Sequence, residues 1–157
     1  MSWLGKTLGS WLGGWLGAQS PSQPALVNIR AALESALNAI TPPFATAWEN
    51  VAFLPTDGAP YQQVHLLFAK PDNFSFGRGW RELGFMQVKV VYPSQAGPAA
   101  AAARAETIRS TFYKGAIFVS GGLSIIVEKT PTVSPGRIEE GRYAVPIKIR
   151  FFVNGMS

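Results

Sequence analysis

The spacing of apolar side chains is most informative between residues 81 and 112, where it changes once. In residues 81–92 apolar and polar side chains alternate, with Gln87 and Lys89 between apolar neighbours, and this period of two is that of a β-strand. A break with proline and glycine follows, and residues 99–112 then carry apolar side chains at helical spacing. We predict a strand, a turn and an amphipathic helix, on which the rest of the chain packs. The strand residues predicted to face one way are Met86, Val88, Val90 and Tyr92, and those facing the other way are Leu83, Phe85 and Val91.

Two segments are predicted to be helices. Residues 25–40 follow Pro24, which suits a first helical turn, and they end before Pro42 and Pro43, which cannot continue a helix. Residues 99–112 form the second helix, in which Arg104 lies off the apolar stripe. The two apolar stripes are Leu26, Ile29, Leu33, Ala36, Leu37 and Ile40 in the first helix, and Ala101, Ala105, Ile108 and Phe112 in the second.

Further strands are predicted from short runs of β-branched, aromatic and alternating residues. The first two are joined by a turn at 55–60 and are candidates for one hairpin, and Gly121-Gly122 is a hairpin turn between the next two. Pro146 has no N–H for a ladder, so the last strand is predicted to lie at a sheet edge or to contain a bulge. The predicted strands are 48–53, 62–69, 117–119, 123–128 and 143–152, and the predicted loops are 70–80 and 130–141.

The order of these elements predicts the fold class. With the strand at 81–92 it reads α-β-β-β-α-β-β-β, which is typical of an α+β domain in which two helices cover one face of a mostly antiparallel sheet. Such a sheet can leave its second face to solvent or to a partner. This domain is predicted to span residues 25–157.

The first twenty residues form a four-residue Trp-Leu-Gly repeat, the arm, which a hinge at residues 21–24 joins to the domain. As a helix the repeat forms a slanted leucine ridge with tryptophans beside it. As a strand it keeps leucine on one face and tryptophan on the other, and the sequence does not decide between the two. The arm residues expected to make contacts are Trp3, Leu4, Leu8, Trp11, Leu12, Trp15 and Leu16.

Three roles compete for the arm. A signal peptide has a continuous apolar run, whereas this segment has repeated glycines and Lys6. It is too short for a transmembrane helix, and an interfacial membrane helix usually has more basic residues on its polar face. Exposed tryptophan and leucine at this density favour an arm that docks on a protein.

Composition narrows the function classes. The chain has 157 residues, which favours one domain with a real core, and 47% of them are hydrophobic and 15% charged, which argues against disorder. The net charge of +5 comes from scattered Lys and Arg residues rather than the stripe of a nucleic-acid binder. Without cysteine the chain has no disulfide, no catalytic thiolate and no cysteine-bound metal.

Candidate catalytic chemistry is sparse. The single histidine, His65, lies in a predicted strand without a nearby acid and nucleophile, so a structural, edge-exposed role is favoured. No His and acid residues have metal-ligand spacing, and Gly77-Arg78-Gly79 is too short for a phosphate loop. We therefore expect neither an enzyme nor a bound cofactor.

Several sequence segments resemble a family of small tailed-phage proteins, the tail terminators. The resemblance covers about residues 25 to 153 and leaves out the arm. It is carried by Arg81-Glu82-Leu83-Gly84-Phe85-Met86-Gln87-Val88, Tyr92-Pro93, Gly97-Pro98-Ala99-Ala100, Arg104-Ala105-Glu106, Ile108-Arg109, Ile29-Arg30-Ala31-Ala32-Leu33-Glu34, Trp48-Glu49-Asn50 and the strand from Tyr143 to Phe151.

The resemblance implies a small α+β subunit of a hexameric ring in the virion neck. Such a ring sits on the last ring of the major tail tube protein, stops its polymerisation and meets a head-side connector, while DNA only passes through. It also implies assembly in the host cytoplasm. The residues we expect at contacts with a neighbouring subunit or the tube are Phe74, Phe76, Arg78 and Trp80, and, at the strand entrance, Arg81 and Glu82.

Alternatives remain open at this point. Phe74 and Trp80 can instead fold back on their own sheet, and Arg81 and Glu82 can cap the loop rather than bridge subunits. A head-completion or stopper protein would have a similar size and place. A peripheral membrane protein that uses the arm is a further alternative, although a membrane is not the favoured partner.

Overall fold

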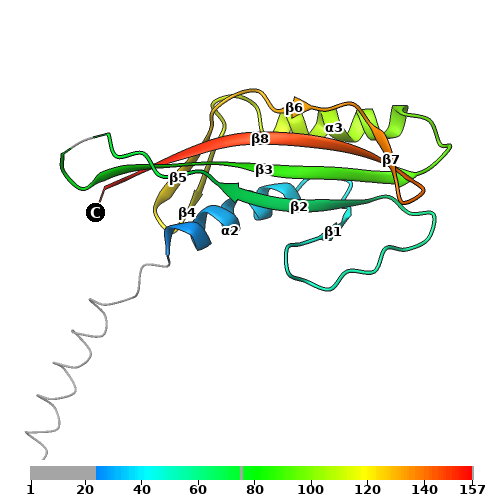
Figure 1. Cartoon of the computed structure of the whole chain (residues 1–157), viewed down its shortest axis with the longest axis horizontal. Helices are drawn as coiled ribbons and strands as arrows, with labels where there is room; N and C mark the ends of the chain where they lie inside the picture. The colour runs from blue at the N-terminus through cyan, green and yellow to red at the C-terminus, as the bar shows by residue number, and fades with distance from the viewer. Residues whose placement is uncertain (1–23, 75, 157) are drawn as a thin grey trace, which may run out of the picture.

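The computed structural model describes residues 24–74 and 76–156. The two helices of this part of the chain are α2 (Ala25–Asn38) and α3 (Ala99–Thr111), as the two apolar stripes predict (Figure 1). The arm at 1–20 and hinge residues 21–23 lie outside the described residues.

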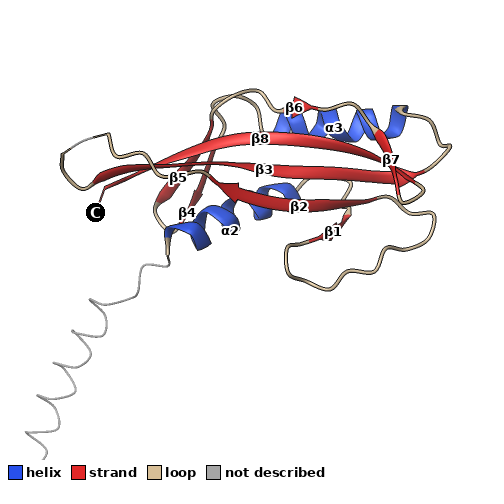
Figure 2. Ribbon diagram, viewed as in Figure 1, coloured by secondary structure: helices blue, strands red, loops and turns tan. Residues whose placement is uncertain are grey.

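The described strands form one sheet, in the order β1-β2-β3-β8-β5-β4, and β6 and β7 also pair with β8 (Figure 2). The strand β1 runs parallel to β2, and the other pairs are antiparallel. The bounds are β1 Ala45–Ala47, β2 Tyr61–Phe68, β3 Gly79–Pro93, β4 Ile117–Ser120, β5 Leu123–Val127, β6 Thr132–Val133, β7 Arg137–Glu139 and β8 Arg142–Met156.

One face of the sheet carries the hydrophobic core. Val64, Val88 and Ile147 lie side by side across β2, β3 and β8, and all three are fully buried. Both helices add side chains to the same cluster, α2 through Ile29, Leu33 and Leu37 and α3 through Ala105 and Ile108. The predicted alternation in β3 is confirmed, since Met86, Val88 and Val90 are buried and Tyr92 packs against the cluster.

The position of Arg104 differs from the expectation that it lies off the buried stripe. Its side chain is only 4% exposed, and its guanidinium donates hydrogen bonds to the carbonyl oxygen of Pro42 (2.7 Å) and to Oε1 of Gln62 (3.3 Å). It also lies 4.0 Å from the ring centroid of Phe44. Burial lowers the pKa of Arg104. The residue thus ties α3 to the segment between α2 and β1, because its donors satisfy acceptors there.

The predicted strand at 48–53 is wrong, and so is the hairpin that it was to form. The strand lies earlier, at β1, and it pairs with β2 in the parallel direction, which a tight hairpin cannot give. Residues 48–60 instead form a connecting loop, in which Phe53 packs on Tyr61 with ring centroids 5.2 Å apart. The aromatic and apolar residues that suggested a strand serve to cover part of the sheet.

The predicted loop at 130–141 contains two short strands, β6 and β7, so five strands rather than three follow the second helix. Pro146 is not at a sheet edge, because β8 lies between β3 and β5. The segment that pairs with this side of β8 is interrupted between β6 and β7, next to Pro146. The Pro146 carbonyl there accepts a hydrogen bond from the Ser134 amide. A residue without an N–H is tolerated at this interruption.

Candidate assembly interface

The second face of the sheet, the open face, exposes a line of apolar side chains at one end. Leu83, Phe152, Ile126 and Ile117 are direct partners in register across β3, β8, β5 and β4. Ile117 is 59% exposed, and Val119, two residues along the same strand, is 67% exposed. We call these five residues the apolar row. Neighbouring apolar side chains on a sheet surface form a continuous patch, which marks a contact site.

The opposite end of the open face is covered by the chain itself. Tyr61, Val91 and Ala144 form a second small cluster under Phe53 of the 48–60 loop. Arg142 holds this loop by donating hydrogen bonds to the carbonyl oxygens of Ala59 (3.2 Å) and Thr56 (3.5 Å). The apolar row therefore lies at the end of the open face that the 48–60 loop does not cover.

Charged side chains occupy the middle of the open face. Lys148 places Nζ 3.9 Å from the ring centroid of Phe85, and Arg150 pairs with Glu128 at 3.1 Å. Beside them is a hollow of about 290 Å³ whose lining includes Gly84 and Leu83. These charged groups border the apolar row.

A second exposed surface is the loop between β2 and β3, which we call the aromatic loop (residues 70–78). It lies at the same end of the molecule as the C-terminal end of β8 (Figure 1). Phe76 is fully exposed and Phe74 is 57% exposed, and Arg78 is exposed as well. The base of the loop is held by two backbone hydrogen bonds between Asp72 and Arg81. The loop thus presents aromatic side chains from a fixed base.

The two charged residues at the entrance of β3 have different environments. Arg81 donates a hydrogen bond to Asn154 (2.9 Å) and lies 5.2 Å from the ring centroid of Phe152 and 5.9 Å from that of Phe74. Glu82 is only 8% exposed, and burial raises its pKa. Within the described residues neither side chain forms an ion pair, while the Arg81 backbone closes the loop.

Trp80 lies in β3 opposite Gly155 and is half-buried. Its indole ring is so close to Gly155 that a Cβ at that position would overlap it. Glycine at 155 therefore leaves the space that the ring occupies. Of the two aromatic residues that could fold back on the sheet, Trp80 does so, whereas Phe74 contacts Arg81 and stays largely exposed.

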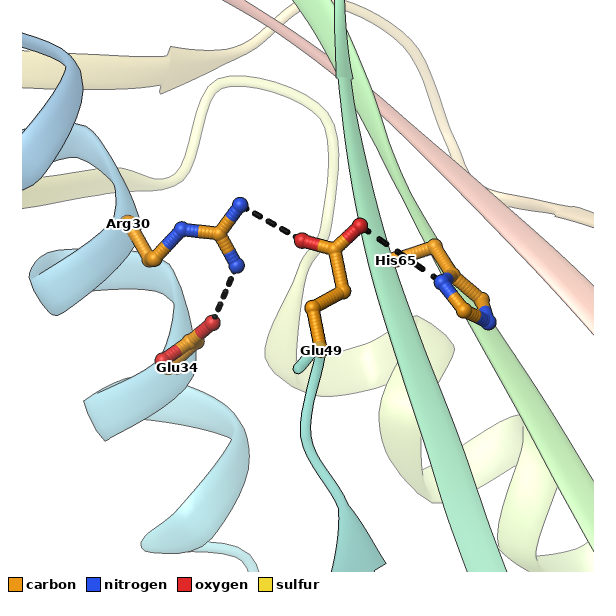
Figure 3. A network of polar contacts seen from close by, with 4 residues as sticks. All are labelled: Arg30, Glu34, Glu49 and His65. Carbon is orange, nitrogen blue, oxygen red and sulfur yellow. Dashed lines mark hydrogen bonds and ion pairs between the residues drawn. The ribbon is translucent and has the colours of Figure 1, made fainter. Parts of the chain in front are cut away.

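The edge of the sheet at β2 is closed by a polar network (Figure 3). Arg30 of α2 pairs with Glu34 at 2.9 Å and with Glu49, which in turn lies 3.5 Å from Nδ1 of His65. Burial acts to raise the pKa of Glu49, but hydrogen bonds from Arg30 and from the Leu66 amide outweigh it and hold that pKa below its ordinary value. His65 is exposed at this edge, as expected from the sequence, but the structure places an acid, Glu49, beside it, which the local sequence did not indicate.

The two edges of the sheet therefore differ. The Glu49 carboxylate accepts a hydrogen bond from the Leu66 amide, on the β2 edge just beyond β1. That amide is therefore not available for pairing with a further strand. On the other edge, no strand within the described ranges pairs with the outer side of β4. Strand β4, which carries Ile117 and Val119, is thus an available edge.

Residues 24–74 and 76–156 contain no group of three His, Cys, Asp or Glu side chains that could hold a metal ion. Within the same ranges, none of the helices is long and apolar enough to cross a membrane.

Sequence reasoning placed the aromatic loop but missed the apolar row. The row draws one residue from each of four strands, so no single segment reveals it. The alternation of Ile117 and Val119 around Phe118 was a signal, because side chains two residues apart in a strand lie on the same face and opposite to the residue between them.

The fold is that of a small α+β domain with two exposed surfaces that carry apolar side chains. Residues 28–151 match the family described as phage tail terminator protein. Because the match covers more than half of the chain, the chain belongs to this family, and the resemblance noted in the sequence is confirmed. The chain is accordingly a structural protein of the phage tail.

Solved structures agree with this fold. A protein without a functional name matches with a TM-score of 0.66 and 27% identity, over 82% of this chain and 95% of its own. A chain from the virion of a native gene transfer agent particle matches with a TM-score of 0.58 and 18% identity, over 85% and 99%. No curated protein matches the chain.

Proposed function

We propose that this chain is a tail terminator subunit that assembles, as a hexameric ring, on the last ring of the major tail tube protein. The ring stops polymerisation of the tube and offers a surface to the head-side connector in the virion neck, after assembly in the host cytoplasm. The role is one of binding, without catalysis or cofactor, and DNA only passes through the ring. Family membership over residues 28–151 is the observation that carries this proposal.

The two exposed surfaces support a ring. A closed cyclic ring is built from heterologous contacts, so each subunit needs two different adhesive surfaces. The aromatic loop, with Phe74, Phe76 and Arg78, is one such surface, and the β4 edge with the apolar row is another. Trp80 and the pair Arg81 and Glu82 lie at the base of the loop. We propose that this loop meets a neighbouring subunit or the tube.

Electron microscopy of particles assembled without this gene tests the terminator role. Overlong tails of irregular length, not attached to heads, are the expected result, because tube growth would lack its stop. Tails of uniform length that fail to join heads would refute termination and assign the protein to the joint. DNA leaking from filled heads would refute it in favour of a stopper.

Variants of the aromatic loop test its role in assembly. Phe76→Ser should keep the midpoint of urea unfolding and lower the amount of subunit that co-sediments with tail tubes, since the fully exposed ring has no packing role in its own chain. Trp80→Ala should also weaken assembly while the domain stays folded. The matched control is Leu54→Ser, which removes a 90% exposed apolar side chain from the 48–60 loop. Equal loss in the control, or normal co-sedimentation of the loop variants, would refute the assignment.

A further inference from the structure

Basic side chains that are scattered along the sequence gather on the open face of the sheet. Arg81 of β3 is the partner of Asn154 in β8, and partners in register share a face. Arg150 and Lys148 lie on the same face of β8 as Asn154, because side chains an even number of residues apart in a strand point the same way. The Arg81 guanidinium lies 5.2 Å from the ring centroid of Phe152, which places its charge at the open-face position next to Arg150.

We call Arg81, Arg150 and Lys148 the basic stripe. The three positions that they occupy follow one another at every second residue of β8, about 7 Å apart along the strand. The sequence did not reveal this stripe, because Arg81 lies far along the chain from the other two residues.

The stripe carries positive charge that the described residues do not balance. Glu128 pairs with Arg150 at 3.1 Å, whereas within the described ranges neither Arg81 nor Lys148 forms an ion pair. Lys148 Nζ lies 3.9 Å from the ring centroid of Phe85 instead. An aromatic ring attracts a cation to its face without removing the charge. Two cations of the stripe are therefore held in place and left without a counter-charge.

A second copy of this chain does not supply the missing negative charge from its described residues. The carboxylates that lack an ion pair in this part of the chain are those of Asp72, Glu82 and Glu140. Glu82 is buried, and the other two lie at opposite ends of the sheet, Asp72 in the aromatic loop and Glu140 in the turn between β7 and β8 (Figure 1). The complement of the stripe is therefore a different molecule, with negative charges that repeat along a line.

We infer that the basic stripe binds the phosphodiester backbone of a nucleic acid. Each strand presents one phosphate for about every 3.4 Å of rise, so cations about 7 Å apart on a straight β-strand reach different phosphates. Aromatic rings among basic groups on a sheet face, as at Phe85 and Phe152, are also typical of nucleic-acid-binding surfaces. The inference goes beyond the proposed function, in which DNA only passes through the ring. It assigns the face that DNA contacts, and it holds for the free subunit whether or not a ring forms.

Fluorescence anisotropy with the purified full-length chain and a short DNA duplex of mixed sequence tests the inference. Affinity should fall as the salt concentration rises from about 50 to 200 mM, with a slope of log K against log salt near about −2.7 for three phosphate contacts. Lys148→Gln should weaken binding to all sequences alike and reduce the size of that slope by about 0.9.

The matched control is Lys114→Gln. It removes an exposed lysine just before β4, outside the stripe, and changes the net charge by the same amount as Lys148→Gln. The slope should stay at the parent value in this control. Both lysines are exposed, so far-ultraviolet circular dichroism of the two variants should match that of the parent chain and show that the fold is kept.

A single-stranded oligonucleotide of the same length is the second probe. Tighter binding of the single strand than of the duplex would show that bases also stack on Phe85 or Phe152. Equal or weaker binding would assign the contact to the backbone alone. Either result supports a phosphate-binding stripe, provided that Lys148→Gln weakens it.

Three results would overturn the inference. No binding of either probe at about 50 mM salt would show that the stripe does not hold phosphates. An equal change of slope in Lys148→Gln and Lys114→Gln would mean that net charge, rather than the stripe, attracts the DNA. Binding of poly-glutamate more tightly than of DNA, with loss in Lys148→Gln, would assign the stripe to an acidic protein.

Discussion

Gly84 in β3 belongs to the segment on which the family resemblance was first noted, and the structure gives a physical reason for glycine there. A Cβ at this position would lie 2.6 Å from the backbone oxygen of Leu67 and 2.8 Å from Cζ of Phe151. In a C–H···O contact the carbon and the carbonyl oxygen lie about 3.3–3.6 Å apart, so β2 and β3 would have to separate locally by roughly 0.7 Å. The Leu67 oxygen is fixed by the ladder and cannot turn away as a side chain could.

We predict that Gly84→Ala destabilises the protein. Overpacking of a core typically costs about 1–3 kcal/mol, and the smaller conformational entropy of alanine in the unfolded chain offsets about 0.5–1 kcal/mol of this. The net loss in the free energy of unfolding should be about 1–2 kcal/mol. For a domain of this size that lowers Tm by about 2–8 °C. Urea unfolding followed by circular dichroism measures the free energy, and the m-value shows whether the denatured state changed.

A second variant separates the two contacts. Phe151→Leu removes the ring atom nearest to the added Cβ but leaves the Leu67 oxygen in place. In that background Gly84→Ala should cost less than in the parent chain, yet still destabilise, since residues in contact are not additive. An unchanged or raised urea midpoint for Gly84→Ala in the parent chain would refute the reasoning, because it would show that the strands accommodate the methyl group freely.

Two further predictions concern the polar networks. Glu49→Gln should lower stability near neutral pH, where the carboxylate accepts hydrogen bonds from Arg30. Because the folded pKa of Glu49 lies below its ordinary value of 4.5, the difference from the parent chain should hold above pH 4.5 and disappear as the pH falls through the lower folded pKa. Urea midpoints measured from pH 7 to pH 3 check this, and a difference that stays constant down to pH 3 would contradict it. Arg104→Ala should destabilise by about 1–3 kcal/mol for each acceptor it leaves unpaired, chiefly the Pro42 carbonyl, as thermal unfolding would show. A Tm equal to that of the parent chain would mean that water replaces the guanidinium.

The local periodicity of the sequence was sufficient to predict the long strands and the two helices. The alternation in β3 and β8 and the helical stripes of α2 and α3 reappear as the buried sides of these elements, and the two glycines between β4 and β5 form the hairpin turn that they predict. These features depend on which neighbours in sequence share one face of a strand or helix, and that relation is fixed by backbone geometry. The aromatic loop was recognisable for a similar reason, since its aromatic residues lie in a glycine-containing stretch between two strands.

Periodicity did not reveal pairings between distant segments. The parallel match of β1 with β2, the two short strands that pair with β8, and the central place of β8 despite Pro146 all depend on partners far along the chain. A loop such as 48–60 can carry the composition of a strand because covering an apolar surface calls for the same side chains as pairing in a sheet.

By itself, the sequence determined the class of the domain, its two helices, its long strands and its membership in a family of tail proteins. Only the tertiary structure decided what lies on the surface and what lies inside. It buried Arg104 between α3 and the chain before β1, and it aligned Leu83, Phe152, Ile126 and Ile117 into one row, in which Ile117 is exposed and the other three are half-buried. The physical reason is that periodicity states which side chains share a face, whereas burial of that face depends on which other elements fold against it.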